Sequence, residues 1–244
     1  MRTITICAQK GGSGKTTTAA AMAAGLNRRG FRVLAVDADG QHSLTKICGA
    51  LPGLTLYDVI TGRATAAATI QKTAQGFDLL PGSQALFTLP DSFMPETLRG
   101  KLSRIARKYD FCVIDTPPAL SLITMGALAA ASDVVLMAAP DVLSLYGIDQ
   151  AADTIEAIRP ISGALSVGIL LTQYNDRLPI DRTMKETIQA RALTMGAFVY
   201  RQTIRAGVAV KKSHLMKEDL FTLAPRAGVT QDYNAFIDEF LKGV

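Results

Sequence analysis

The chain alternates short apolar runs with longer segments in which apolar residues recur every three or four positions. The short runs are rich in β-branched residues and predict buried strands at 3–8, 31–36, 77–80, 111–115, 133–139, 165–172 and 197–200. The longer segments predict helices at 16–29, 43–48, 56–61, 95–108, 120–131, 144–159, 180–195 and 232–241. Residues 64–73 show neither the strand pattern nor the helix pattern, and we interpret them as a connection between elements. Strands and helices that alternate with short links indicate a single α/β domain over 1–244, with a mostly parallel, twisted sheet and helices on both faces.

A glycine-rich turn joins the first predicted strand to the first helix, and its residues 9–17 are Gln-Lys-Gly-Gly-Ser-Gly-Lys-Thr-Thr. Glycines let consecutive N–H groups point at an anion, and the helix N-terminus adds about half a positive charge. Lys15 is placed to reach the β- and γ-phosphates, and the Thr16 hydroxyl to bind Mg²⁺. The turn therefore predicts a site for ATP and Mg²⁺ formed by Lys10, Gly11, Gly12, Ser13, Gly14, Lys15, Thr16 and Thr17.

Carboxylates follow two of the other predicted strands. Asp37 and Asp39 are two residues apart at the end of one strand, so their side chains project together. Asp115 closes the apolar run 111–114 in the Walker B pattern, which delivers a carboxylate near Mg²⁺, often through water. The carboxyl edge of a parallel sheet is where ligands bind in open α/β folds. We therefore expect these aspartates beside the glycine-rich turn.

Lys10 precedes the glycines, and Gln9 occupies the position of the first glycine in the usual G-x-x-x-x-G-K-S/T loop. The string Lys-Gly-Gly-x-Gly-Lys-Thr at 10–16 resembles the deviant Walker A motif of the ParA/MinD family of ATPases. The resemblance extends over nearly the whole chain and is most specific at 10–17, 37–39 and 111–118. It implies a P-loop NTPase fold, Mg²⁺-dependent ATP hydrolysis and a homodimer that forms with ATP.

The family resemblance also implies catalytic roles. Lys15 holds the phosphates, and Lys10 crosses the dimer interface to neutralise charge on the partner's nucleotide. Asp39 positions the attacking water, while Asp37 supports the metal site. The chain departs from the family pattern after Asp39, where Gly40 replaces a proline and His42 replaces a glycine, so we expect a looser turn there.

Two further segments carry candidate binding residues. In the loop after 165–172, Asn175 resembles the residue with which the family recognises adenine, although a turn-forming asparagine is an equal alternative. The stretch 201–217 contains five basic residues and no acid, which fits a DNA-backbone footprint as well as a solvated face. Its candidate DNA-binding residues are Arg205, Lys211, Lys212 and Lys217. The outward basic side chains of 95–108 are interpreted as a solvated face, with a docking surface as the alternative.

Composition and charge bear on the expected partners and cellular compartment. The net charge of +5 permits binding to nucleic acid or to anionic lipid, without showing either. The three widely spaced cysteines indicate buried free thiols in a reducing cytosol. Met1 leads straight into a strand, so we expect no signal peptide. The C-terminal segment 232–241 has one apolar face but carries three acidic residues, which favours packing in the core over binding anionic lipid.

These observations favour a ParA-like DNA-partition ATPase, cytoplasmic and nucleoid-associated, that binds DNA non-specifically and works with a ParB-like adaptor, with no membrane partner. Two alternatives stay open: a MinD-like positioning ATPase at a membrane, and a metabolic P-loop ATP-dependent synthetase. A nitrogenase-iron-protein-like electron carrier is disfavoured because no cysteine follows Cys112.

Overall fold

A computed structural model describes residues 1–90, 93–118 and 121–243. One sheet runs through these residues in the order β3-β4-β2-β5-β1-β6-β7-β8, and every neighbouring pair is parallel except β3 with β4. The strands are β1 (Arg2–Cys7), β2 (Val33–Asp37), β3 (Gln71–Lys72), β4 (Asp78–Leu80), β5 (Phe111–Asp115), β6 (Asp133–Ala138), β7 (Ser166–Leu171) and β8 (Phe198–Val199). The predicted α/β class with a mostly parallel sheet is confirmed.

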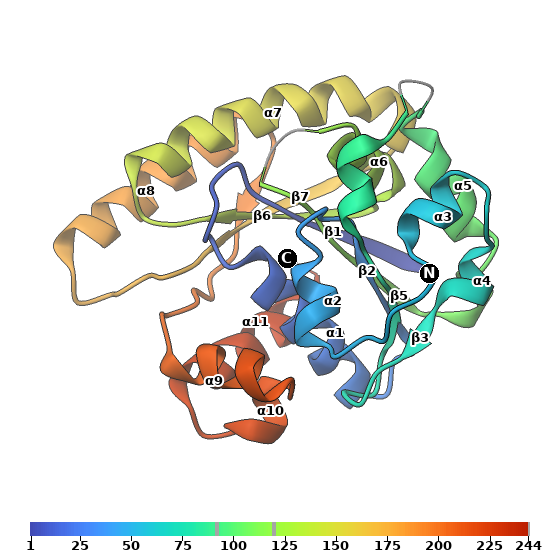
Figure 1. Ribbon diagram of the computed structural model, residues 1–244. Coiled ribbons are helices and arrows are strands. Elements are labelled where there is room, and N and C mark those ends of the chain that lie inside the picture. Colours follow the sequence, from blue (N-terminus) through green and yellow to red (C-terminus); the bar gives the residue numbers. More distant parts are fainter. Residues whose placement is uncertain (91–92, 119–120, 244) are drawn as a thin grey trace.

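Helices cover both faces of this sheet (Figure 1). One face packs against α1 (Lys15–Arg28), α2 (Ser43–Ile47), α9 (Val208–Met216), α10 (Leu220–Leu223) and α11 (Gly228–Lys242). The other packs against α3 (Leu56–Ile60), α4 (Ala66–Thr69), α5 (Glu96–Ser103), α6 (Leu122–Ala130), α7 (Val142–Ser162) and α8 (Pro179–Thr194). Two 3₁₀ turns, η1 (Gln84–Thr88) and η2 (Ala106–Lys108), complete the described elements. The apolar core is therefore divided into layers on either side of β1, β5 and β6.

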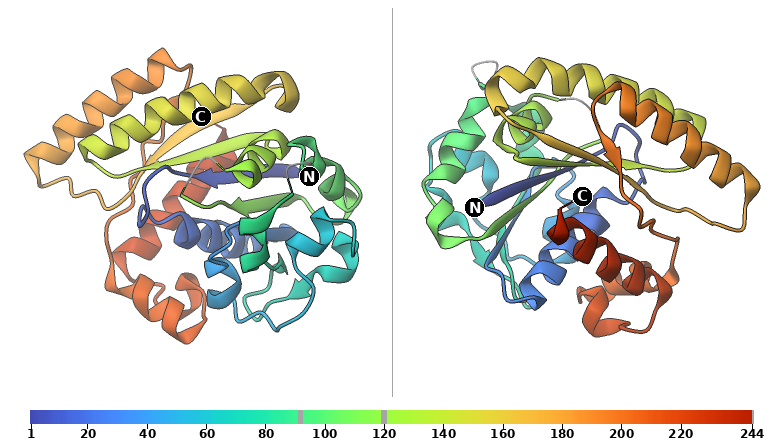
Figure 2. Two further views of the ribbon diagram at one scale, coloured as in Figure 1. Left: turned by 45° about the horizontal axis from the view of Figure 1, so that its top comes forward. Right: turned by 180° about the vertical axis from the view of Figure 1, so that it is seen from behind.

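The first and last helices pack against each other beneath the sheet (Figure 2). A Cβ at Gly25 of α1 would clash with Cδ1 of Ile237, so the glycine permits this close approach. The hydroxyls of Thr18 and Tyr233 lie 2.9 Å apart in the buried contact. The expectation that the C-terminal helix packs in the core is confirmed, with Tyr233, Phe236, Ile237 and Phe240 all buried.

Several expected boundaries were wrong. Residues 64–73 contain α4 and β3, and this two-residue edge strand is too short to show an alternating pattern. The single helix expected at 95–108 ends at Ser103, although Leu98, Leu102 and Ile105 are buried as expected. Helix α9, within 201–217, was missed because its apolar residues do not form one buried stripe. The expected helix 120–131 is observed from Leu122, and its first residue lies outside the described residues.

No helix in the described part of the chain is both long enough and apolar enough to cross a membrane.

Candidate nucleotide-binding site

The glycine-rich turn lies at the carboxyl end of β1, the strand between β5 and β6. It leads directly into α1, whose first residue is Lys15. Gly12 and Gly14 have positive φ values of 75° and 90°, a backbone region that residues with a side chain rarely adopt. The helix N-terminus and these glycines together meet the local requirements for a phosphate cradle, as predicted.

Lys15 is nearly buried at the base of this turn. Its side-chain Nζ lies 3.3 Å from the carbonyl oxygen of Lys10, and the residue is only 7% exposed. Burial lowers the pKa of Lys15, whereas the nearby Asp115 and Asp39 carboxylates oppose that shift. The chain therefore directs a desolvated cation at the position where phosphate oxygens are expected.

Asp37 and Asp115 are the last residues of β2 and β5 and stand opposite each other in the register of the two strands. Both are fully buried, and Asp39 nearby is 7% exposed. Burial raises the pKa of Asp37 to about 6, in spite of hydrogen bonds from Thr45. Burial and the adjacent Asp37 also raise the pKa of Asp115 well above its usual value. Three carboxylates thus share a site with one buried lysine, an arrangement that favours a further cation.

The donor groups fit Mg²⁺ bound together with a nucleotide. The Thr16 hydroxyl donates a hydrogen bond of 2.7 Å to Oδ2 of Asp115, whereas the buried Oδ1 of Asp115 has no hydrogen-bond partner among the described residues. Although three aspartates lie near Lys15, no group of three His, Cys, Asp or Glu side chains within the same residues is placed to hold a metal ion by itself. Mg²⁺ is usually held by one or two protein oxygens together with substrate phosphates and water, which this donor set matches.

Asp37 is the third predicted metal residue, but its oxygens already have partners. Oδ2 accepts hydrogen bonds from the Thr45 amide at 2.7 Å and the Thr45 hydroxyl at 2.6 Å, and Oδ1 accepts one of 3.2 Å from the Asp39 amide. Sequence reasoning missed Thr45, which lies in α2 and has no motif of its own. The contribution of Asp37 to metal binding stays a prediction.

Gly40 and His42, the departures from the family pattern, lie directly after Asp39. A Cβ on Gly40 would lie 2.8 Å from atoms of the Phe87 ring, so the glycine accommodates this aromatic side chain. His42 adopts a left-handed conformation with φ of 46° before α2, and its Nδ1 lies 3.2 Å from the Gly40 carbonyl oxygen. Asp39 itself accepts a hydrogen bond of 2.9 Å from the Gln41 amide. The turn after Asp39 is thus fixed by local contacts instead of a proline.

Lys10, predicted to act on a partner's nucleotide, forms an ion pair within its own chain. Its Nζ lies 2.5 Å from Oδ2 of Asp141, the N-cap residue of α7. Burial acts to raise the pKa of Asp141, but hydrogen bonds from Lys10 and Ser144 outweigh it, and the pKa is lowered. Asp141 was not identified from the sequence, because nothing local links a helix cap to a lysine 131 positions earlier.

Two residues after β7 hold the glycine-rich turn from the side. The Thr172 hydroxyl donates to the Ser13 carbonyl oxygen at 2.8 Å, and Nε2 of Gln173 donates to the Gly12 carbonyl oxygen at 2.7 Å. Gln173 does so from a left-handed conformation with φ of 55°. Sequence reasoning singled out this loop only for Asn175 and missed both contacts.

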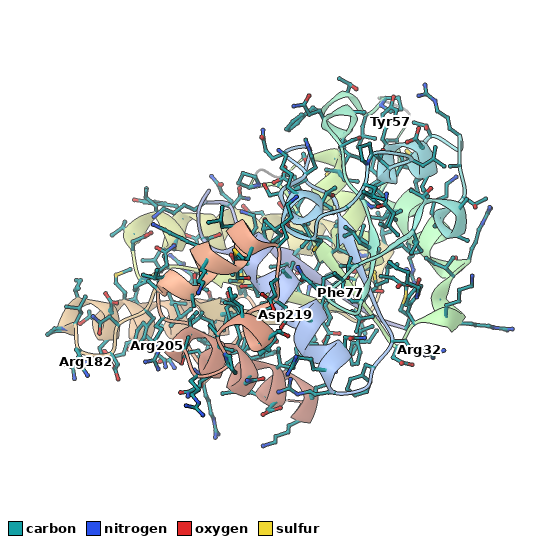
Figure 3. The ribbon with its side chains drawn as sticks, turned by 60° about the horizontal axis from the view of Figure 1, so that its bottom comes forward. Arg32, Tyr57, Phe77, Arg182, Arg205 and Asp219 are labelled. Carbon is teal, nitrogen blue, oxygen red and sulfur yellow. The ribbon has the colours of Figure 1, made fainter. Side chains whose placement is uncertain are left out.

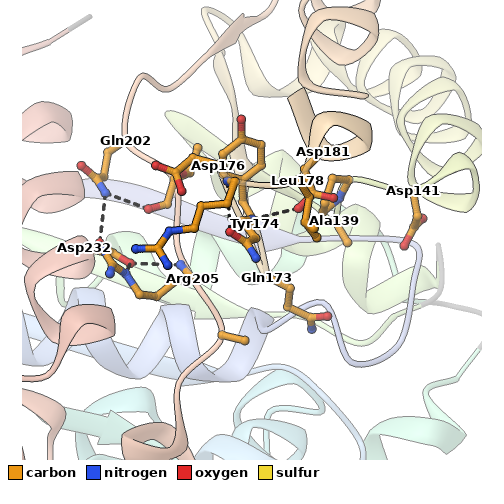
Figure 4. A pocket seen from close by; sticks show the side chains of 15 residues that line it. Ala139, Asp141, Gln173, Tyr174, Asp176, Leu178, Asp181, Gln202, Arg205 and Asp232 are labelled. Atoms are coloured by element: carbon orange, nitrogen blue, oxygen red, sulfur yellow. Dashed lines mark hydrogen bonds and ion pairs between the residues drawn. The ribbon is translucent and has the colours of Figure 1, made fainter. Parts of the chain in front are cut away.

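A cavity of about 1000 Å³ lies beside this loop, lined by residues after β6, β7 and β8 (Figure 4). Asn175 contributes to its wall, as expected of a base-binding residue. The Asn175 side-chain oxygen accepts a hydrogen bond of 3.1 Å from the Arg177 amide, which is also the contact of a turn-forming asparagine. The Asp181 carboxylate accepts a hydrogen bond of 2.8 Å from the backbone N–H of Asn175. Adenine binding in this cavity and the role of Asn175 in it stay predictions.

The predicted DNA-binding residues do not form one group. Arg205 lines the cavity and donates two hydrogen bonds to Asp232, at 2.7 and 2.9 Å, so its charge is balanced within the chain. Lys211 and Lys212 are exposed on α9, and Lys217 follows the helix at its C-cap. Lys211 and Lys212 are therefore neighbours on one exposed helix, whereas Arg205 is held by Asp232.

Comparisons with known proteins agree with this geometry. A family model described as an AAA domain matches residues 1–165. The chromosome-partitioning ATPase Soj of Thermus thermophilus is 31% identical over 248 residues, covering 100% of this chain and 97% of that protein. A ParA family protein of Chlamydia trachomatis is 29% identical over 252 residues, covering 99% and 98%. Among solved structures, the cobyrinic acid a,c-diamide synthase of Mycobacterium smegmatis with bound ADP and magnesium is 27% identical, with a TM-score of 0.79 over 99% of this chain and 94% of that chain. The similarity thus extends well beyond the glycine-rich turn.

Proposed function

The chain belongs to the ParA family of P-loop ATPases, and from its site we infer that it partitions or positions DNA by an ATP-dependent cycle of dimerisation. In this proposal ATP and Mg²⁺ hold two subunits face to face, and the dimer binds DNA without sequence preference. A ParB-like adaptor on the cargo triggers hydrolysis. The observation that carries the ATPase assignment is the buried Lys15 among Asp39 and Asp115, at the carboxyl edge of the sheet.

Each residue of the site has a distinct task in this cycle. Lys15 and the amides of the turn bind the phosphates, while Thr16 and Asp115 hold Mg²⁺. When bound, the metal neutralises charge on the β- and γ-phosphates. Asp39 orients the attacking water. Lys10 leaves Asp141 and supplies positive charge in trans as the γ-phosphate departs, as an arginine finger does in other P-loop enzymes.

DNA binding is assigned to α9. Among the ion pairs of the described residues, none involves Lys211, Lys212 or Lys217, so their charges are available to phosphates. One such stretch gives weak non-specific affinity, about 10⁻⁴–10⁻⁶ M at physiological salt. A dimer that presents two copies on one surface gains roughly 10²–10⁴ in avidity if both engage. Nucleotide would thereby control DNA binding without altering a DNA-contacting residue.

The test is a titration of a random-sequence duplex with ATP, with ADP and without nucleotide, across a salt series. Lys211→Ala with Lys212→Ala is expected to weaken ATP-dependent binding equally on unrelated sequences. It should also flatten the log–log salt dependence by about 0.9 for each phosphate that is no longer neutralised. Arg182→Ala with Lys242→Ala removes two exposed cations elsewhere and is the matched control. Lys15→Ala, which removes the buried cation, should abolish binding of a fluorescent ATP analogue. Equal wild-type DNA affinity with ATP and with none would reject the proposal.

Two other functions have specific support. The likeness to the Mycobacterium smegmatis synthase favours a metabolic ATP-dependent synthetase, which ATP hydrolysis without any DNA affinity would support. Val208 and Leu215, 82% and 80% exposed, share the outer face of α9 with Lys211 and Lys212. That mixture of apolar and basic side chains also fits a positioning ATPase at an anionic membrane. ATP-dependent pelleting with anionic vesicles, abolished when Leu215 is replaced by Ser, would favour this function over DNA partition.

A further inference from the structure

A second basic surface lies away from the nucleotide site and has no part in the function proposed above. It comprises α5, η2 and the neighbouring turns, and we call it the α5 surface. Its exposed or half-buried basic residues are Arg32, Arg63, Lys72, Arg99, Lys101, Arg104, Arg107 and Lys108. The sequence alone suggested a solvated face for 95–108, but the fold adds cations from three other segments.

Close contacts join these segments into one surface. The Lys101 Nζ lies 3.9 Å from the position of a Cβ on Gly62, which places it beside the turn that carries Arg63. Beyond the C-terminal end of α5, Lys108 of η2 lines a cavity of about 600 Å³ together with Arg32 and Lys72. The basic residues therefore continue from the α3–α4 turn across α5 to the amino ends of β2 and β4.

Most of the charge on the α5 surface is not balanced within the chain. Arg32 pairs with Asp110 at 2.7 Å, and Lys72 with Asp78 at 2.8 Å. The ion pairs found in the described residues include none of the other six, which are Arg63, Arg99, Lys101, Arg104, Arg107 and Lys108. By contrast, Arg2, Arg29 and Arg205 each pair with a carboxylate elsewhere in the chain. Uncompensated like charges repel one another, and a polyanion would relieve that repulsion.

We propose that the α5 surface binds the phosphate backbone of a nucleic acid, as a second contact site distinct from α9. Arg104, at the C-cap of α5, and Arg107 of η2 can contact phosphate oxygens in a forked geometry, and lysines add point charges. Arg99 already donates from Nη1 to the Ile161 carbonyl oxygen at 2.8 Å, so its Nε and Nη2 remain for a phosphate. No large apolar side chain is exposed in 62–73 or 95–110, all of which the structure describes. Membrane-surface segments and protein interfaces usually contain such side chains, so a polyanionic backbone is the better match.

The location of the α5 surface predicts how nucleotide affects it. Arg32 precedes β2 and Lys108 precedes β5, while Lys72 pairs in register with Asp78, the first residue of β4. All three therefore lie at the edge where the parallel strands begin, whereas Lys15 and the site carboxylates lie at the edge where those strands end. Arg32 and Arg205 lie on opposite sides of the molecule (Figure 3). A dimer that closes over the nucleotide would leave both copies of the α5 surface accessible. The contribution of this surface to DNA binding is therefore independent of ATP, in contrast to that of α9.

The inference rests on the proposed function only in taking DNA as the nucleic acid, and its test separates the two. The variant is Arg104→Ala, Arg107→Ala and Lys108→Ala, whose side chains are exposed, with thermal unfolding as the check on folding. Anisotropy titrations of a random-sequence duplex across a salt series compare it with wild type and with the α9 variant. Each protein is measured with ATP and without nucleotide. Arg182→Ala with Lys242→Ala again serves as the control.

We expect the α5 variant to bind DNA roughly tenfold more weakly in both nucleotide states, with a log–log salt slope reduced by about 0.9 for each phosphate that it no longer neutralises. The α9 variant should lose far more affinity with ATP than without nucleotide, because only the dimer presents two copies of α9. An α5 effect without an α9 effect would retain this inference and reject the α9 assignment, and the reverse result would overturn this inference alone. Wild-type DNA affinity in the α5 variant overturns the inference. Pelleting with phosphatidylserine vesicles is measured in parallel. If the α5 variant loses vesicle binding but not DNA binding, the inference is also overturned.

Discussion

The Nζ of Lys10 and Oδ2 of Asp141 lie 2.5 Å apart within one chain, although Lys10 is the residue predicted to act on a partner's nucleotide. Asp141 also caps α7, since its Oδ1 accepts a hydrogen bond of 2.8 Å from the Ser144 amide. One carboxylate thus serves both a helix terminus and the lysine. In our proposed cycle this ion pair must open before the dimer is competent for hydrolysis, so it opposes assembly.

Asp141→Asn is therefore expected to favour the ATP-bound dimer. Asparagine retains the helix cap but lacks the charge that holds Lys10. Both side chains are partly exposed, so each pair contributes about 0.5 kcal/mol, and the two pairs of a dimer correspond to roughly a fivefold change in the dimerisation constant. Light scattering across a protein concentration series with ATP measures the dimerisation constant. A dimerisation constant equal to that of wild type, or a smaller one, would show that the pair does not restrain Lys10.

Asp39→Ala should bind ATP, fail to hydrolyse it and accumulate as a dimer. The side chain is nearly buried and contributes to the charge around Lys15, but among the described residues it accepts a hydrogen bond only from the Gln41 amide. Its removal should therefore leave the phosphate cradle intact. Phosphate release and light scattering are measured in parallel, with Asp39→Asn as the variant that retains the size of the side chain. Normal turnover in the alanine variant would limit Asp39 to a structural role.

Asp37→Asn should change how stability depends on pH in the metal-free, nucleotide-free protein. Burial raises the pKa of Asp37 to about 6, above its ordinary value of 3.8. The folded chain therefore keeps a proton that the unfolded chain loses, and the associated stability is full below about pH 4 and lost as the pH rises through 6. The effect is on the order of 3 kcal/mol.

Urea unfolding at pH 4 to 7 measures this difference between wild type and variant. Asn cannot ionise, so the decline of stability towards neutral pH should be smaller in Asp37→Asn. Asp115 should retain part of the decline, because burial raises its pKa as well. Parallel pH curves for the two proteins would contradict the raised pKa of Asp37.

Gln173→Ala should weaken ATP binding about three- to tenfold, because the variant cannot donate the hydrogen bond to the Gly12 carbonyl oxygen. Gln173→Asn is the matched variant, since asparagine tolerates the left-handed backbone better but its side chain is one methylene shorter. Weaker binding of a fluorescent ATP analogue in both variants would assign the effect to the side-chain hydrogen bond. Normal binding in both would show that the turn keeps its shape unaided.

The parts of the site that the sequence predicted are those encoded by adjacent residues. Lys15 and Thr16 follow from the spacing of the turn, and Asp115 follows from an acid at the end of an apolar run. The parallel sheet then brings Asp37 opposite Asp115, as expected of strands that end at one edge.

The interactions that the sequence did not reveal join distant segments. Gln173 and Gly12 are 161 positions apart, and no local pattern marks a glutamine as a hydrogen-bond donor to a loop. Arg205, in the loop before α9, looked available for DNA because its partner Asp232 lies far along the chain, in α11. The α5 surface was similarly underestimated, since Lys72 and Arg32 join it only through the fold.

The packing of α11 on α1 also has a consequence for synthesis on the ribosome. The helix that begins with Lys15 is made early, but Tyr233 and Ile237 are needed to cover it. Domains usually fold as units, and a nascent chain lacking these residues would leave a small-residue helix face open to solvent. We therefore expect ATP capture to begin only once the last helix has emerged, so that incomplete chains do not enter the dimerisation cycle.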